Sequence, residues 1–177
     1  SLTSVANHVF SGCNKLTYTN YNNGKYLGND KNAYAVLMEA VSKDVAQFQI
    51  HPDTKVLAAH AFKRCGNLTE ITIPKGVTGI GLHTFSYCGK LKSVTIPDTV
   101  TRIDSYAFYE CVSLTDAYIP KVEAWCNIRF GDYNATPFKY LKNCYIDGKI
   151  VTHLVIPGSV KKINDDAFSE AKYLTEI

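Results

Sequence analysis

Histidine and cysteine are the most chemically versatile side chains in this sequence, and both recur at fixed spacing. His8, His60 and His83 each stand two residues before a phenylalanine. His60 and His83 are 23 residues apart, so in a chain that repeats with this period their rings should stack about 5 Å apart and could share a Zn²⁺ ion. Further ligands are missing from the matching positions, which hold Tyr106 and Asp166. We therefore interpret the row as facing solvent, and we expect no metal site and no cofactor.

The cysteines offer little prospect of catalysis. Four of the six follow a phenylalanine by three residues: Cys13, Cys65, Cys88 and Cys111. We assign this position to the core, where free cysteine acts as a small apolar side chain and lacks the accessible thiolate of a nucleophile. Cys126 with His153 is the one catalytic pair to consider, and we expect no enzyme. A bridge between Cys126 and Cys144 is an alternative to free thiols.

The elements that position these side chains are set by a repeat of 23 residues. Residues 73–95 read IPKGVTGIGLHTFSYCGKLKSVT, and residues 96–118 read IPDTVTRIDSYAFYECVSLTDAY. The anchoring phenylalanines are Phe10, Phe62, Phe85, Phe108 and Phe168. A fixed period in this range predicts a solenoid.

Each repeat predicts one coil of that solenoid. The Leu-x-x-Ile-x-Ile stretch alternates as a strand with one buried face, and the proline that follows ends it. Residues 104–108 resemble a short helical turn that must pack on the strands. Stacked coils bury a core of Phe, Leu, Ile and Cys. The fold class is therefore an α/β solenoid, right-handed, with a parallel β-sheet and short helical returns.

Two gaps between anchors are too long and predict β-hairpin insertions, at about 20–44 and 121–150. We expect the repeat to resume at Ile50–Pro52 and at Ile156–Pro157. Hairpin turns are predicted at Asn23-Gly24, Asn29–Asn32 and Asp147-Gly148, with a short helix from Pro120 through Trp125. For Tyr26, Tyr34 and Trp125, core filling beneath the hairpins and an aromatic binding platform are both open interpretations.

This pattern resembles the BspA-like leucine-rich repeats, also called the Treponema pallidum class. The matching residues are Ile96-Pro97, Val100, Ile103, Ala107-Phe108, Cys111 and Leu114, and again Ile156-Pro157, Val160, Ile163, Ala167-Phe168 and Leu174. The resemblance implies an extracellular or cell-surface protein, mostly bacterial or protozoal, that acts in adhesion or protein binding. It also implies the absence of a shared catalytic residue, so the family supplies no site by motif.

The bulk properties fit one elongated domain over residues 1–177. The net charge of +3 comes from scattered basic residues, so we expect no nucleic-acid partner, and no apolar stretch is long enough to span a membrane. The chain begins and ends inside a repeat, although solenoids normally carry polar caps. We therefore interpret it as a fragment of a longer chain, in which end-stacked dimers would be an artefact of the cut ends.

The outward face of the predicted sheet is the best binding candidate. Its two rows are Gln49, Thr72, Thr95, Tyr118 and Val155, and Gln47, Glu70, Ser93, Asp116, His153 and Glu176. The binding candidates are the members of both rows up to Asp116 and Tyr118, with Tyr118 as the anchor because tyrosine is enriched in binding hot spots. We expect recognition of a protein, with host or matrix proteins the first to consider. A solvated face on a structural spacer and a glycan-binding module are the alternatives.

Overall fold

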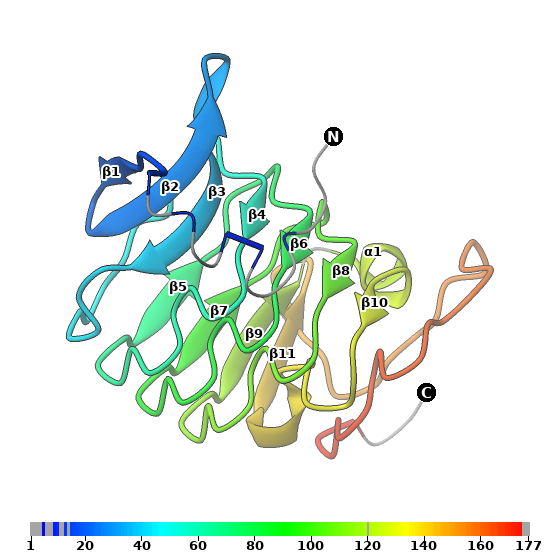
Figure 1. Cartoon of the computed structure of the whole chain (residues 1–177). Helices are drawn as coiled ribbons and strands as arrows, with labels where there is room; N and C mark the ends of the chain where they lie inside the picture. Colours follow the sequence, from blue (N-terminus) through cyan, green and yellow to red (C-terminus); the bar gives the residue numbers. More distant parts are fainter. Residues whose placement is uncertain (1–4, 6–8, 11–12, 14, 120, 175–177) are drawn as a thin grey trace.

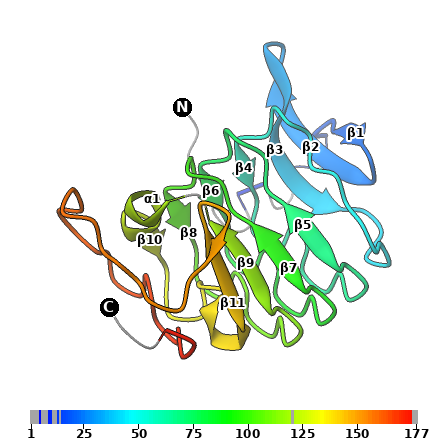
Figure 2. The ribbon, with the colours of Figure 1, turned by 180° about the vertical axis from the view of Figure 1, so that it is seen from behind.

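The protein is a β-solenoid built from two stacked sheets. The computed structural model describes residues 5, 9–10, 13, 15–119 and 121–174. In this part of the chain, sheet A has the order β1 (Thr19–Tyr21), β2 (Gly24–Asn29), β3 (Asn32–Ala40), β4 (Val56–Leu57), β6 (Gly79–Ile80), β8 (Arg102–Ile103) and β10 (Arg129–Phe130). Sheet B has the order β12 (Lys149–Ile150), β11 (Asn143–Ile146), β9 (Asp116–Ile119), β7 (Ser93–Thr95) and β5 (Glu70–Thr72). The two sheets enclose the core (Figures 1 and 2).

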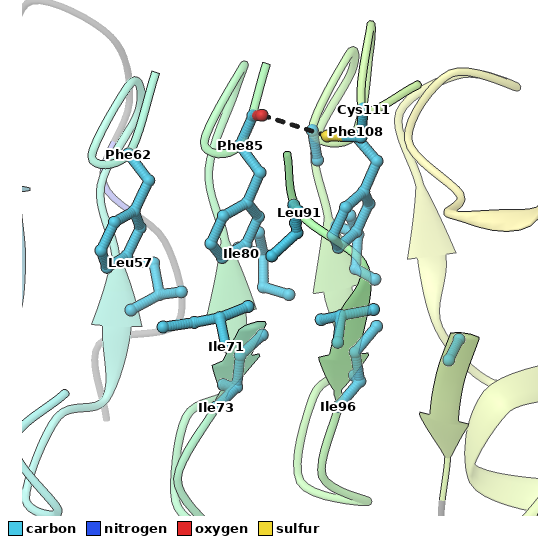
Figure 3. Close-up of a cluster of buried hydrophobic side chains, with 14 of the residues drawn as sticks. Leu57, Phe62, Ile71, Ile73, Ile80, Phe85, Leu91, Ile96, Phe108 and Cys111 are labelled. Atoms are coloured by element: carbon cyan, nitrogen blue, oxygen red, sulfur yellow. Dashed lines mark hydrogen bonds between the residues drawn. The ribbon is translucent and has the colours of Figure 1, made fainter. Parts of the chain in front are cut away.

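The core repeats from coil to coil, as the sequence predicts. The rings of Phe62, Phe85 and Phe108 stack with centroids 5.2 and 5.3 Å apart (Figure 3). The Sγ of Cys88 donates a hydrogen bond to the carbonyl of Phe62 at 3.1 Å, and the Sγ of Cys111 donates one to that of Phe85 at 3.2 Å. Each thiol thus links its coil to the preceding one, and the predicted solenoid with 23-residue repeats is confirmed.

The return segments differ from the predicted helical turns. His60, His83 and Tyr106 have φ of 63°, 53° and 57°, and a left-handed residue interrupts the hydrogen bonding of a right-handed helix. The segments before the phenylalanines are therefore successive turns. The stretch between the proline and these turns supplies the second parallel sheet, through β4, β6, β8 and β10.

The first insertion extends sheet A at one end of the solenoid. β1, β2 and β3 form an antiparallel meander, and β3 then pairs parallel with β4. The predicted turn at Asn29–Asn32 is present, but the first turn is Asn22-Asn23, one residue earlier than predicted. Both of these asparagines have positive φ, 42° and 65°. Tyr26 is fully buried, which favours core filling for this residue.

The second insertion proves to be mostly a coil in register. α1 (Val122–Cys126) occurs near its predicted place, followed by β10, the 3₁₀ helix η1 (Phe138–Tyr140) and β11. β10 pairs with β8, and β11 pairs with β9, each 27 residues farther along the chain. The predicted hairpin at Asp147-Gly148 joins β11 to β12. The repeat therefore resumes at β10, well before the predicted Ile156.

The two terminal copies depart from the repeat. Cys13 is exposed, which contradicts its predicted place in the core. Val5 packs on a separate apolar cluster of Val36, Val56 and Ala58. In the last copy Ile163 is 45% exposed, whereas Ile103 is fully buried at the same repeat position. His8 and Glu176 lie outside the described residues.

Candidate functional site

The outward side of sheet B presents the predicted site residues in two rows. Strand register aligns the first row as Glu70, Ser93, Asp116 and Asn143, and the second as Thr72, Thr95, Tyr118 and Tyr145. Between these rows Ile71, Val94 and Ala117 point into the core and are buried. Gln47 and Gln49 lie in the extended segment before β4, and both are exposed. The structure thus brings the eight predicted residues to one face.

Two members of the rows were predicted wrongly. Asn143 and Tyr145 occupy the places after Asp116 and Tyr118, where the sequence pattern predicts His153 and Val155. The error follows from the coil of 27 residues, which the fixed period of 23 passes over. The signal was present in the sequence, because Cys144-Tyr145-Ile146 repeats the apolar–tyrosine–apolar order of Ala117-Tyr118-Ile119.

The exposed Tyr118 and the half-buried Tyr145 form an aromatic pair at one end of the face. Their ring centroids are 4.5 Å apart and their planes differ by 12°. Tyr118 remains 40% exposed. Partial burial, followed by the neighbouring Tyr118 and Asp116 groups, raises the pKa of the Tyr145 hydroxyl, so the Tyr145 phenol stays protonated at neutral pH.

The opposite end of the face is hollowed into an open groove with a volume of about 720 Å³. Four predicted residues line it: Gln47, Gln49, Glu70 and Thr72. Phe48 and Ile50 supply apolar surface, and Asn22 donates a hydrogen bond through Nδ2 to Oε1 of Gln49 at 3.2 Å. The face therefore offers a mixed polar and apolar groove at one end and a stacked tyrosine pair at the other.

The histidine row exists, but its geometry does not suit a metal ion. The His60 and His83 rings are 5.4 Å apart and nearly parallel, at 14°, so their in-plane lone pairs do not converge. Ser86 donates its hydroxyl to the carbonyl of Tyr106, so it accepts from Nδ1–H of His83 at 2.9 Å. Burial, with help from Lys63, lowers the pKa of His83. No cluster of three potential metal-ligating side chains occurs in the described residues.

The buried thiols are poor nucleophiles. Burial raises the pKa of Cys111 to about 12 and also raises those of Cys65, Cys88, Cys126 and Cys144. Cys126 is buried while His153 is exposed, so the pair does not present an activated thiolate. Cys126 and Cys144 are free thiols.

Family comparison supports the same architecture. The BspA type leucine rich repeat region matches in six copies over residues 41–142 and 139–177. The chain belongs to the BspA-type leucine-rich repeat family. No curated protein matches it in sequence. In the part of this BspA-type chain that the structure describes, no helix has the length and apolar character needed to cross a membrane.

Two solved structures show the same BspA-type fold. The pneumococcal vaccine antigen PcpA is 22% identical with a TM-score of 0.59, and the match covers 78% of this chain and 32% of that one. The T. pallidum leucine-rich repeat protein is 24% identical with a TM-score of 0.57, covering 89% of this chain and 69% of that one. The chain thus spans about a third of the solved PcpA chain.

Proposed function

We propose that this chain is a non-catalytic recognition module of a cell-surface protein, and that it binds a protein partner through the outward face of sheet B. The observation that carries the proposal is that one face holds both an open groove and the exposed Tyr118 stacked on Tyr145. Solenoid proteins use such extended surfaces for partners, and tyrosine is a frequent interface anchor. Surface location is in keeping with the name of PcpA as a vaccine antigen.

The test is a binding screen of the whole chain against cell-surface and extracellular-matrix proteins by biolayer interferometry. A double variant, Asp116→Ala with Tyr118→Ala, removes the aromatic end of the face. A matched control, Glu110→Ala with Tyr87→Ala, also removes one carboxylate and one tyrosine. These two residues lie in turns outside the face, where Tyr87 is 45% exposed. We expect the control to bind as the wild type does and the face variant to lose at least about tenfold in affinity.

Each other outcome contradicts part of the proposal. If binding survives in the face variant and falls in the control, the site lies on the turns that carry Glu110 and Tyr87. A folded chain that binds no protein in the screen contradicts protein recognition, and it favours a spacer that holds other domains apart. Binding to glycans alone favours the glycan-binding alternative, because exposed tyrosine rings can also stack on sugars.

A further inference from the structure

Six outward residues on β5, β7 and β9 of sheet B form a compact grid. Its two rows of three are Glu70, Ser93 and Asp116, then Thr72, Thr95 and Tyr118. Neighbouring strands in a sheet lie about 4.8 Å apart. Ser93 and Thr95, the short side chains of the middle strand, therefore form a low shelf. A carboxylate flanks Ser93 on each side, and the ring of Tyr118 stands beside Thr95.

Within the part of the chain that the structure describes, no lysine, arginine or histidine pairs with either carboxylate. The ion pairs in the described residues are Lys25–Glu39, His51–Asp53, Arg102–Asp104 and Lys172–Glu170. Neither Glu70 nor Asp116 takes part in them, and neither row of the grid contains lysine or arginine. Lys92, next to Ser93 in sequence, makes no ion pair with either carboxylate. The shelf therefore presents negative charge that is complementary to a positively charged ligand.

Neutral donors hold the Asp116 carboxylate in place. Nδ2 of Asn143 donates to Oδ1 at 2.9 Å, and the hydroxyl of Thr115 donates to Oδ2 at 2.6 Å. A carboxylate oxygen has two lone pairs, so each one can still accept another hydrogen bond. The group is thus oriented before a ligand arrives, which reduces the cost of binding.

Tyr118 supplies the second element of recognition. One face of its ring is covered by Tyr145, and the other looks over the short Thr95 side chain on the neighbouring strand. Among the described residues, Tyr118 makes no further ring contact. Its free face attracts a cation through the ring quadrupole. A planar guanidinium can stack on that face and also form two hydrogen bonds to a carboxylate, which an ammonium cannot do.

We propose that the shelf over Ser93 and Thr95 binds an arginine side chain of the partner protein. The guanidinium lies against the free face of Tyr118 and donates to Asp116, while Glu70 adds a second negative charge. This inference rests on the proposed function, because it names the chemistry that the same face recognises. It specifies a partner with an arginine exposed on its binding surface.

The experiment uses three blocked pentapeptides and the isotope-labelled whole chain. The peptides carry arginine, citrulline or lysine between glycines, and amide chemical shifts report binding by NMR. Citrulline keeps the shape of arginine without its charge. We expect the arginine peptide to shift the amides of Ser93, Thr95 and Tyr118, and the citrulline peptide to bind at least about tenfold more weakly. The lysine peptide should bind with intermediate affinity. Raising the salt concentration from about 0.05 to about 0.5 M should weaken the binding of both cationic peptides.

Variants assign the effect to named groups. The double variant Glu70→Gln with Asp116→Asn keeps the shape of both side chains and should lower the affinity for the arginine peptide about tenfold. Tyr118→Leu keeps an apolar side chain at this position and should lower the affinity for the arginine peptide about threefold. The matched control, Glu110→Gln with Tyr87→Leu, alters a carboxylate and a tyrosine outside the grid and should leave binding unchanged.

Equal binding of arginine and citrulline peptides, or an unchanged affinity of the variant Glu70→Gln with Asp116→Asn, overturns the inference. Maltotetraose that shifts the same amides when the arginine peptide does not would replace it with a saccharide site. If the arginine peptide fails while a protein from the screen still depends on Tyr118, the arginine inference fails and protein recognition stands. If that screen also finds no partner, both proposals fail.

Discussion

The central coils, residues 56–119, and the coil that follows them, residues 121–146, keep the same strand register with different residues. In the central coils the phenylalanine position holds the stacked Phe62, Phe85 and Phe108, and the position three residues later always holds cysteine. In the following coil Ala135 stands at the phenylalanine position and Phe138 at the cysteine position, and both are buried. The strand register therefore depends on strand pairing and on a core filled to the same side-chain volume. It does not require the same residue type at each core position.

The following coil restores its volume with an added element. Trp125 on α1 is 2% exposed, and its ring centroid lies 5.2 Å from those of both Phe130 and Phe138. Its Nε1 donates to the carbonyl of Ala167 at 2.6 Å. The extra residues of this coil lie between β9 and β10, where they form α1 without disturbing either sheet.

The largest effect is expected from breaking the phenylalanine ladder. Phe85→Ala should lower the free energy of unfolding by about 3–5 kcal/mol, because Phe85 is fully buried between two other rings. Phe168→Ala, in the half-buried last copy, should cost clearly less. Urea denaturation followed by circular dichroism measures both. Equal losses at the two positions would contradict the distinction between the central coils and the last copy.

Trp125→Phe tests whether the following coil relies on its tryptophan. The change removes the hydrogen bond to Ala167 and part of the ring contact, so we expect a loss of about 1–3 kcal/mol. Residues 154–174 should also become sensitive to limited proteolysis, since Trp125 ties them to α1. A variant with wild-type stability and protease resistance would show that sheet pairing alone maintains this coil.

High pH should lower the free energy of unfolding of the protein, because the thiols buried in the central coils ionise more easily in the unfolded chain. The pKa of Cys111 is about 12 in the folded chain against an ordinary value of 9.0. A raised pKa means that the unfolded chain loses its proton first, so the stabilisation present below pH 9 is lost as pH rises toward 12. Between about pH 9 and 10 the wild type should lose about 1 kcal/mol more than Cys111→Ala. Parallel urea midpoints across this range would rule out a contribution from the buried thiol.

The smallest effect distinguishes the turns of the two regions. Glu110 has φ of 57°, a strained conformation for a residue with a Cβ, whereas Pro137 at the matching place has φ of −76°. Glu110→Gly should therefore stabilise the protein by up to about 1 kcal/mol. Tyr133→Gly, where φ is not positive, should bring no gain. Thermal unfolding compares the two, and a similar change in both variants would remove turn strain as a difference between the regions.

Periodicity predicts much of this molecule, and its limits have physical causes. The spacing of Phe85 and Phe108 predicts the ladder, and the alternation around Ile71 predicts an outward face. Tyr145 was missed because a period carries no information across an insertion that changes its length. The left-handed turn at His83 was also missed, because no glycine or asparagine marks it. Cys13 shares the cysteine spacing and yet is exposed, so spacing alone does not bury a residue.

The strict alternation along the strands of sheet B separates two kinds of selective pressure. Ile71, Val94 and Ala117 face inward and are buried in the core, whereas their neighbours on each strand lie on the outward side and are exposed or half-buried. Duplication or deletion of one coil during evolution would give each outward residue new neighbours and leave the core sequence intact. Genetic exchange between repeats can therefore vary the residues on this face without first producing a protein that fails to fold.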